Sequence, residues 1–535
     1  MSERVQPNSA FQNGMCLTGT QTRVKDVSPL SGMCALCIRE CPFLCEVSLS
    51  SFRGREVLYP VNDYFGNSTA ASIKDARLDW SDFNIMAELR GAKGIEADSN
   101  KALFEKADIS TSMGGIHLRA PVIAGAFGST AVAKVNWDGL AVGCALAGSS
   151  IVIGENVCAM DPDVKIANGK VTDSEDMAYR VNRFREYWDR KNGDVVIQTN
   201  VEDQRLGVDD YALSKLEVNA IERKWGQGAK AIGGEVRLTS IERAKQLKSR
   251  GYIVVPDPDD PAVQDAFKAG TFKTFERHSR VGMPAYEPFV EDVENLRSKG
   301  AKFVTIKTGA YRPSDVAWTM KVASEAKVNY VTFDGAGGGT GMSPVPMMNE
   351  MSTPTVYLEA QVLKCCQILK RKGKYIPDIA MAGGFMNETQ IYKTIALSNF
   401  GDGPHVKGVV MARSPLTSVM KCSYFEELGK AGRLPKAFTD KYGSQPEQYY
   451  NAFTELRTKY GEEVKKMPLP GIGLYTYLQD RIAVGLKQLL AGSRRFKLDL
   501  IDRTCIASLT ERANKVTGIP LLEDLDAEEM ESILD

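Results

Sequence analysis

Residues 330–344 have the sequence YVTFDGAGGGTGMSP, and the expected fold is organised around this stretch. An aromatic and β-branched run at 330–333 predicts a buried strand. The run ends at Asp334, and five glycines lie between Gly335 and Gly341. Glycine amides can approach a phosphate or a ring edge closely because no Cβ intervenes. A flexible linker is the alternative, but linkers are typically serine-rich with polar flanks, so the stretch favours a ligand-binding turn after a core strand.

Short apolar runs like this one recur along the chain and alternate with helix-like segments. Strands that alternate with helices pair in parallel, and eight such units predict a closed (β/α)8 TIM barrel, with a doubly wound open sheet as the alternative. The runs are residues 121–126, 150–153, 194–199, 220–223, 303–306, 330–333, 378–382 and 408–411. The long gap at 233–293 predicts an insertion at the barrel mouth. We expect three parts: an N-terminal arm with a cysteine-rich segment (1–115), the barrel (116–425) and a helical C-terminal extension (426–535).

Binding and catalytic residues of such barrels follow the carboxyl ends of the strands. Lys307 comes directly after the fifth run, where a lysine is costly unless it meets an anion; a lysine that extends to solvent is the alternative. The candidate site residues are Gly125, Ala126 and Phe127 after the first run, Glu155 after the second, Asn200 after the third, Lys224, Gln227 and Lys230 after the fourth, Lys307 after the fifth, Asp334, Gly335, Gly338, Gly339 and Thr340 after the sixth, Gly383 and Gly384 after the seventh, and Ala412 and Arg413 after the eighth.

The segments that follow the seventh and eighth runs predict a phosphate-binding site. Gly383 and Gly384 expose backbone amides, and Asn387 then caps a helix. Arg413 precedes a Ser-Pro pair at 414–415, which predicts a helix N-cap followed by proline at the first helical position. Helix N-termini and bare amides bind phosphate, and barrels of this type hold one at the last two strands. Two ordinary strand–helix turns are the alternative.

Four cysteines lie within twelve residues near the N-terminus, separated by two, three and three residues. Pro42 follows the third, as is common beside iron–sulfur ligands. A structural zinc site is the main alternative, although zinc ligands usually form two distant pairs, and an unmetallated segment is the third possibility. The spacing favours an iron–sulfur cluster of the 4Fe-4S type. Its expected ligands are Cys34, Cys37, Cys41 and Cys45.

The composition argues against several classes of protein. The 535 residues carry 67 basic and 67 acidic side chains, so nothing points to nucleic acid or an anionic membrane surface. Neither a charged-then-apolar N-terminal pattern nor an apolar run long enough to span a bilayer stands out. The eleven cysteines form an odd number, and several lie singly in apolar segments, which favours thiols in a reducing compartment. We expect a cytoplasmic homo-oligomer.

Three motifs resemble those of the FMN-binding synthase domain of glutamate synthases, in the short, stand-alone form. DGAGGGTGMSP at 334–344 resembles the family's DGxxGGTGxSP and is the most specific match. RLGV at 205–208 resembles R-F-G-V, and KWGQGAK at 224–230 resembles K-x-x-QGAK. The resemblance covers most of the chain. It implies a barrel that binds FMN with its phosphate on the last two units, takes electrons from an iron–sulfur cluster, and makes and reduces a 2-imino acid in glutamate biosynthesis.

The resemblance also implies roles for individual residues. Lys307 would stabilise negative charge on the reduced flavin, and the glycine turn would let the ring or phosphate approach. Lys224, Gln227 and Lys230 would hold a carboxylate or oxo group of the substrate. Glu155 would move a proton during imine formation. Glu155, Lys224 and Lys307 are thus the expected catalytic residues, and 2-oxoglutarate is the expected substrate.

The chain departs from the family pattern in three places. The substrate loops, usually Gly-Glu-Gly-Gly, have the sequences GENV at 154–157 and AIGG at 231–234. Only Cys422 represents the cysteine triplet that follows the eighth strand, so the N-terminal quartet would supply the cluster. The start Met1-Ser2-Glu3 lacks the nucleophilic cysteine of a glutaminase domain, so ammonia, an amine or an amidotransferase partner would provide nitrogen.

Two other functions stay open on these observations. The first is a flavoprotein of the same fold that acts on a different amino-acid-like substrate, such as an N-alkyl amino acid. The second is an electron-transfer subunit of a larger complex, with an electron-donor protein as its partner. A flavin-free barrel isomerase or aldolase is a more distant alternative.

Overall fold

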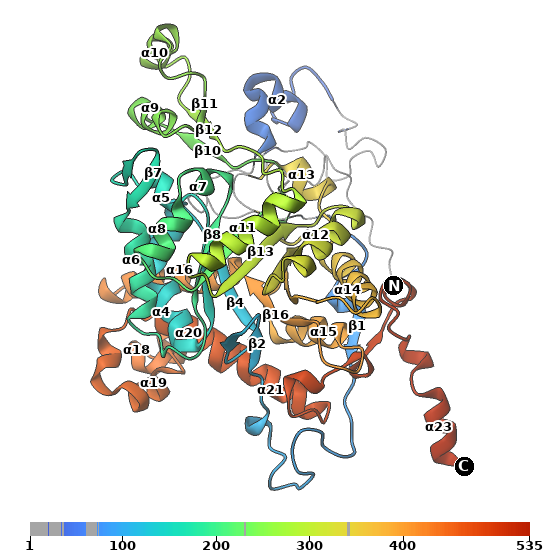
Figure 1. The fold of residues 1–535 in the computed structure, drawn as a ribbon. Helices are drawn as coiled ribbons and strands as arrows, with labels where there is room; N and C mark the ends of the chain where they lie inside the picture. The colour runs from blue at the N-terminus through green and yellow to red at the C-terminus, as the bar shows by residue number, and fades with distance from the viewer. Residues whose placement is uncertain are drawn as a thin grey trace.

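The computed structural model describes residues 20, 34, 37–59, 72, 74–228, 230, 232–339 and 343–535. Eight parallel strands stand at its centre (Figure 1). They are β4 (Val122–Phe127), β5 (Ser150–Ile153), β8 (Val195–Thr199), β9 (Ala220–Lys224), β13 (Phe303–Gly309), β14 (Tyr330–Asp334), β15 (Asp378–Ala382) and β16 (Val406–Met411). Neighbours follow chain order, and β16 pairs with β4, so the sheet closes on itself. The predicted (β/α)8 barrel is confirmed, and the open sheet is excluded.

Helices between the strands cover the outside of the barrel. Several begin at the polar residues that favour N-caps: the Ser174 side chain accepts from the Met177 amide, and Asn387 forms a capping box with Gln390. The helices are α3 (Ala131–Val135), α4 (Trp137–Ala147), α5 (Val157–Met160), α6 (Glu175–Arg185), α7 (Val201–Arg205), α8 (Val208–Ser214), α11 (Tyr286–Ser298), α12 (Pro313–Glu325), α13 (Val345–Glu350), α14 (Thr355–Arg371), α15 (Glu388–Ser398) and α16 (Arg413–Lys430). A small hairpin, β6 (Lys165–Ala167) with β7 (Lys170–Asp173), lies between α5 and α6.

A second hairpin closes the amino-terminal end of the barrel. It consists of β2 (Thr111–Met113) and β3 (Ile116–Leu118), whose apolar side chains join those of the barrel interior. The amide of Gly114, at its turn, donates to Asp378 Oδ2 at 2.7 Å, where β15 begins. A ligand therefore approaches the interior from the carboxyl ends of the strands.

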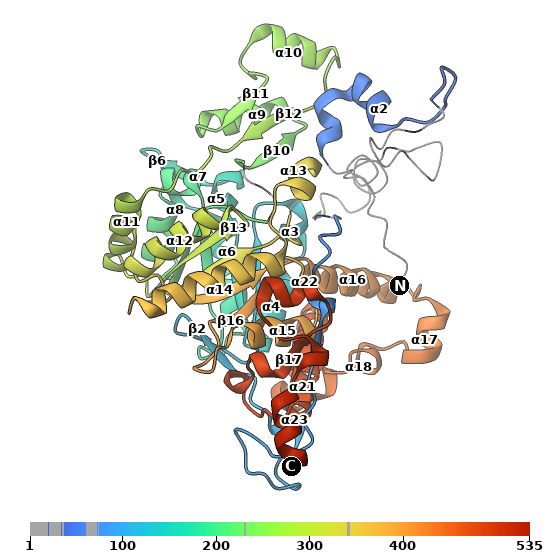
Figure 2. The same cartoon turned by 90° about the vertical axis from the view of Figure 1, so that its right-hand side faces the viewer.

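The segment between β9 and β13 forms a small sheet of its own. Its strands β10 (Glu235–Leu238), β12 (Phe275–His278) and β11 (Ile253–Val255) pair antiparallel in that order, with helices α9 (Ile241–Ser249) and α10 (Pro261–Lys268). In Figures 1 and 2 it projects above the barrel, and α2 (Glu46–Arg53) lies beside it. Arg55 forms an ion pair with Glu276 of β12, and the Tyr59 hydroxyl donates to Glu235 of β10. The cysteine-bearing segment is thus fastened to this insertion.

The C-terminal extension packs on the barrel. In α20 (Leu469–Tyr475) the residues from Pro470 onward are buried, and the helix lies so close to α4 that a Cβ on Gly143 would come within 2.6 Å of Leu474 Cβ. β1 (Phe83–Ile85) pairs with β17 (Ile506–Ser508), which joins the segment before the barrel to the C-terminal extension. The remaining helices are α17 (Lys436–Tyr442), α18 (Pro446–Tyr449), α19 (Phe453–Tyr460), α21 (Ala483–Gly492), α22 (Glu511–Thr517) and α23 (Ala527–Leu534). In the described part of the chain, the search for membrane-spanning helices found none of sufficient length and apolar character.

Candidate active site

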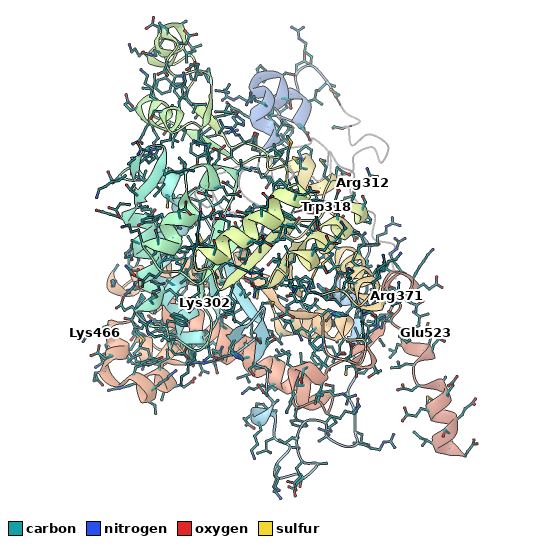
Figure 3. All side chains as sticks on the ribbon, in the orientation of Figure 1. Lys302, Arg312, Trp318, Arg371, Lys466 and Glu523 are labelled. Carbon is teal, nitrogen blue, oxygen red and sulfur yellow. The ribbon has the colours of Figure 1, made fainter. Side chains whose placement is uncertain are left out.

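A cavity of about 1280 Å³ opens at the carboxyl ends of the barrel strands. Residues that follow all eight strands line it, and the insertion supplies a further wall. The predicted catalytic, cofactor and substrate residues all lie on its surface except two. Gly335 packs behind the turn against Thr355, and Thr340 lies outside the described residues. Trp318 of α12 also lines the cavity, whereas Lys302 lies at the opposite end of the barrel, just before β13 (Figure 3).

The glycine turn after β14 packs directly on the turn after β15. A Cβ on Gly337 would lie 2.5 Å from the carbonyl carbon of Gly383, and one on Gly338 would lie 2.3 Å from Asp334 Oδ1. The Gly335 amide donates to the Ala382 carbonyl at 2.9 Å. Only glycine fits between these two backbones, so the turns present peptide groups rather than side chains to the cavity.

Lys224 lies at the centre of a network of hydrogen bonds. Its Nζ donates to both carboxylate oxygens of Glu155 at 3.1 Å, to Gln198 Oε1 at 3.3 Å, and to Gln227 Oε1. Burial lowers the pKa of Lys224, and the Glu155 charge opposes that shift. Burial would raise the pKa of Glu155, but the Lys224 charge and hydrogen bonds outweigh it, and the pKa is lowered. The predicted substrate lysine and the predicted proton carrier therefore form one ion pair.

Lys307 meets an anion, as its position after the fifth run indicated. The strand continues three residues beyond the predicted end, so the side chain lies within β13 and faces the interior. Its Nζ lies 3.5 Å from Asp334 Oδ2 at the end of β14, and both side chains are more than nine-tenths buried. The alternative of a lysine that extends to solvent is excluded.

The ends of β15 and β16 carry two helix N-termini. Asn387 caps α15 as expected. The predicted N-cap at residue 414 is wrong: α16 already begins at Arg413, with Ala412 as its N-cap. Ala412 has φ −109° and ψ −57°, so the backbone is already helical two residues before the serine. Burial lowers the pKa of Arg413, whose side chain lines the cavity beside the glycine amides.

The insertion brings two arginines to the cavity that the sequence did not single out. Arg277 is 1% exposed, donates to Ser279 Oγ at 2.6 Å and lies over the Tyr252 ring at 4.6 Å. Its Nε has no hydrogen-bond partner among the described residues. Arg280 donates to the fully buried carboxylate of Glu202 at 3.0 Å. Neither arginine follows a barrel strand, so a search restricted to the residues after the predicted barrel strands could not identify them.

Lys230 adds a third cation to this wall. Burial lowers the pKa of Lys230 to about 8. Its amide donates to the Gln227 carbonyl at 2.8 Å, which keeps both residues of the motif on one tight turn. The wall is therefore electropositive near Lys224 and apolar further out, where Ile232, Val236 and Val281 line the cavity.

The four cysteines of the N-terminal segment are half-buried or exposed and carry free thiols. Among the described residues, which include all four, no group of three or more histidine, cysteine or acidic side chains is arranged to hold a metal ion. Cys45 precedes α2, and hydrogen bonds from Ser48 lower the pKa of its thiol. The iron–sulfur site therefore stays a prediction.

Residues 282–405 match the family model described as the conserved region in glutamate synthase. The chain therefore contains this conserved region, which runs from before α11 to the start of β16 and includes the glycine turn. None of the curated proteins matches the chain in sequence.

Among solved structures, the recombinant flavin-binding domain of baker's yeast flavocytochrome b2 shares 15% identity over 84% of this chain and 83% of that chain, with a TM-score of 0.42. A mutant of an active chimera of (S)-mandelate dehydrogenase shares 14% identity over 80% and 88% of the two chains, with a TM-score of 0.39. A mandelate oxidase mutant shares 9% identity over 78% and 84%, with a TM-score of 0.41. These likenesses are too remote to carry an argument, and the fold rests on the barrel itself.

Proposed function

We propose that this protein is an FMN-dependent oxidoreductase of glutamate synthase type that reductively aminates a 2-oxo acid, 2-oxoglutarate in the first instance. The observation that carries the proposal is the pair of lysine–carboxylate contacts, Lys224 with Glu155 and Lys307 with Asp334. They lie at the carboxyl ends of a barrel that contains the conserved glutamate synthase region. Carboxylate–lysine pairs inside a cavity favour proton transfer and anion binding.

The residues at the last two strands fit the phosphate of FMN. α15 and α16 begin after these two neighbouring strands, and Gly383 and Gly384, which follow β15, have φ values of +108° and +94°. A Cβ on Gly383 would lie 2.7 Å from the Gly335 amide, so the backbone itself forms the cradle. Helix N-termini and bare amides favour phosphate oxygens, and Arg413 adds a cation. FMN, when bound, accepts and returns a hydride; the protein supplies position and charge.

The chain's own side chains divide the remaining work. Lys307 would stabilise negative charge on the flavin, and its ion pair with Asp334 would keep its side chain oriented. Arg277 and Lys230 would bind the substrate carboxylates, since Arg277 Nε is buried without a partner. Lys224 would hold the oxo group, and Glu155 would accept and return the proton that imine formation requires.

One observation favours a second candidate, the same chemistry on a less polar substrate. Ile232, Val236 and Val281 form an apolar part of the cavity wall next to the cations. A substrate with one carboxylate and an alkyl group, such as an N-alkyl amino acid, would use this surface. Ammonia, an amine or an amidotransferase partner would supply the nitrogen, and an electron-donor protein would supply the electrons. An electron-transfer role within a larger complex is the further alternative.

The iron–sulfur cluster is tested separately. We expect Cys37→Ser to remove iron from protein purified without oxygen while FMN stays bound, because thiolate spacing favours a cluster. Iron and flavin content would be measured on the same sample, with Cys366→Ser as the control, since that thiol is buried in α14. Equal iron in the wild type and Cys37→Ser would exclude the quartet as ligands.

The function itself is tested by reoxidation of the flavin. The purified protein is reduced anaerobically with dithionite, the excess is removed, and flavin absorbance is followed after addition of 2-oxoglutarate with ammonium. Return of the oxidised bands together with formation of glutamate is the expected result. Bands that stay bleached with this pair, but return with oxygen, would overturn the 2-oxoglutarate assignment and direct the screen to N-alkyl amino acids. A flavin-free protein that does not take up FMN would overturn the cofactor assignment.

A further inference from the structure

Glu222 is an acidic residue inside the barrel, close to Lys224, and the proposed reaction does not use it. Glu222 is on β9, two residues before Lys224, so both side chains point to the same face of the strand. Its side chain is fully enclosed, at 1% exposure. Gln198 Nε2 donates to Glu222 Oε1 at 2.6 Å, and Thr305 Oγ1 donates to Glu222 Oε2 at 3.4 Å.

Gln198 of β8 connects Glu222 to Lys224. Its amide nitrogen is used by Glu222, and its amide oxygen accepts from Lys224 Nζ at 3.3 Å. A glutamine amide has one donating and one accepting end, so the bond to Glu222 decides which end faces the lysine. An ammonium group has three protons, and the acceptors on Glu155, Gln198 and Gln227 use all three.

We propose that Glu222 is a positioning residue that orients the Gln198 amide and thereby keeps Lys224 in its ammonium form, directed at Glu155. Without an acceptor at position 222, the amide can turn over and present its NH2 group to the ammonium, which removes one of its three hydrogen bonds. The role deepens the proposed function, in which Lys224 holds the substrate, but the hydrogen-bonded chain exists without any substrate.

Charged groups from four strands face Lys224. Burial lowers its pKa, Glu155 beyond β5 raises it, Lys307 of β13 lowers it further, and Asp334 of β14 raises it. Glu222 shares strand β9 with Lys224; burial raises the pKa of Glu222, and a neutral carboxyl still accepts through its carbonyl oxygen. Because the ammonium form of Lys224 is already disfavoured by burial, the loss of one acceptor should be visible in its titration.

The experiment measures that titration without turnover. Cyanate carbamylates free amines and not ammonium groups, so the rate at Lys224 as a function of pH, read by peptide mass spectrometry, follows its protonation. Lys215, which is exposed, serves as the internal reference for the reagent. We expect Glu222→Met to move the midpoint of Lys224 about one pH unit lower, the effect of losing one charged hydrogen bond. Glu222→Gln retains an acceptor and should leave the midpoint in place.

A second variant protects the test against misfolding. Gln198→Leu removes the connecting amide and should lower the Lys224 midpoint as Glu222→Met does. Unchanged midpoints in the variants that melt like the wild type would overturn the proposal, and an equal shift in Glu222→Gln would assign the effect to charge rather than to orientation. Because no substrate or flavin turnover enters the measurement, its failure is distinguishable from failure of the proposed function.

Discussion

At the scale of single residues, three cations on the barrel strands are matched to carboxylates from other elements. Lys224 faces Glu155, Lys307 faces Asp334, and Arg223 on the outside of β9 is held by Asp209 and Asp292. Such pairs offset the cost of burying a charge only when the geometry is good and the other donors are used. The contacts with Glu155 and Asp334 therefore orient Lys224 and Lys307 before any ligand arrives.

Lys307→Met should weaken the binding of FMN. A charged hydrogen bond contributes about 1.5–3 kcal/mol, which corresponds to roughly 10- to 100-fold in affinity. Fluorescence titration of flavin-free protein with FMN measures the change. Lys302→Met is the matched control, because Lys302 lies at the other end of the same strand (Figure 3). Equal affinity in both variants, together with an unchanged flavin reduction potential, would contradict the role given to Lys307.

Asp203 predicts a pH dependence of stability. Its carboxylate accepts from the amides of Asn156 at 3.0 Å and Asn200 at 3.2 Å, which ties the ends of β5 and β8 together. Burial raises the pKa of Asp203 to about 7, well above the value near 3.8 of an unfolded aspartate. The folded state therefore binds a proton that the unfolded state releases, and this contribution is complete below pH 3.8 and lost as the pH rises to about 7.

Replacement by asparagine should remove this pH dependence. Urea midpoints of Asp203→Asn between pH 4 and 8 should fall less with rising pH than those of the wild type. Asp265→Asn on the exposed face of α10 is the control, and its profile should follow the wild type. Parallel profiles for Asp203→Asn and the wild type would show that Asp203 titrates normally.

At the scale of elements, the glycine turn after β14 is fitted to its neighbour without space for a side chain. A Cβ on Gly337 would meet backbone atoms of Gly383 and Gly384 at 2.5 Å, and backbone cannot give way as a flexible side chain does. Gly337→Ala should therefore separate the two turns, lower stability by about 1–3 kcal/mol and reduce FMN content. Thermal melting and flavin content on one preparation test both. Gly492→Ala, where nothing lies within 4 Å, should change neither.

The barrel strands were predictable because parallel strands are buried on both faces and therefore form continuous apolar runs. The end of β13 was predicted three residues too early, since the charge of Lys307 suggested a strand end; Asp334 compensates that charge inside the barrel. Arg277 and Glu222 were missed for different reasons. The gap at 233–293 predicted an insertion at the barrel mouth, but nothing in the sequence tells which of its residues face the cavity. Glu222 belongs to the run AIER at 220–223, where a single acid carries no pattern.

At the scale of the whole molecule, the C-terminal extension is part of the barrel's support. Gly139 and Gly143 of α4 admit α20 so closely that Cβ atoms there would meet Pro470 and Leu474 within 2.8 Å. Tyr477, just beyond α20, lines the cavity and donates its hydroxyl to the Met386 carbonyl. The sequence predicted helices here, but it could not identify the surface that they cover. The apolar pattern of a helix identifies the face that is buried and not the element against which that face packs.

Removal of this extension should therefore prevent folding of the barrel. A chain that ends at residue 435 should accumulate as insoluble protein, since it exposes the apolar side of α4. A chain that ends at residue 526 lacks only α23, which contains no buried residue. Its melting temperature should lie within about 1–2 °C of the wild-type value. Soluble yield and melting temperature of the two truncations decide the matter. A soluble shorter chain that retains FMN would contradict this account.

The contacts of Tyr59 with Glu235 and of Arg55 with Glu276 have a consequence for how such chains diverge. Each contact joins a residue before the barrel to one in the insertion, so a change on one side alone removes a partner from a half-buried carboxylate. The N-terminal segment and the insertion should therefore be inherited as one module. In an alignment of relatives these positions should vary together, and a chimera that exchanges the insertion should need the matching N-terminal segment to fold.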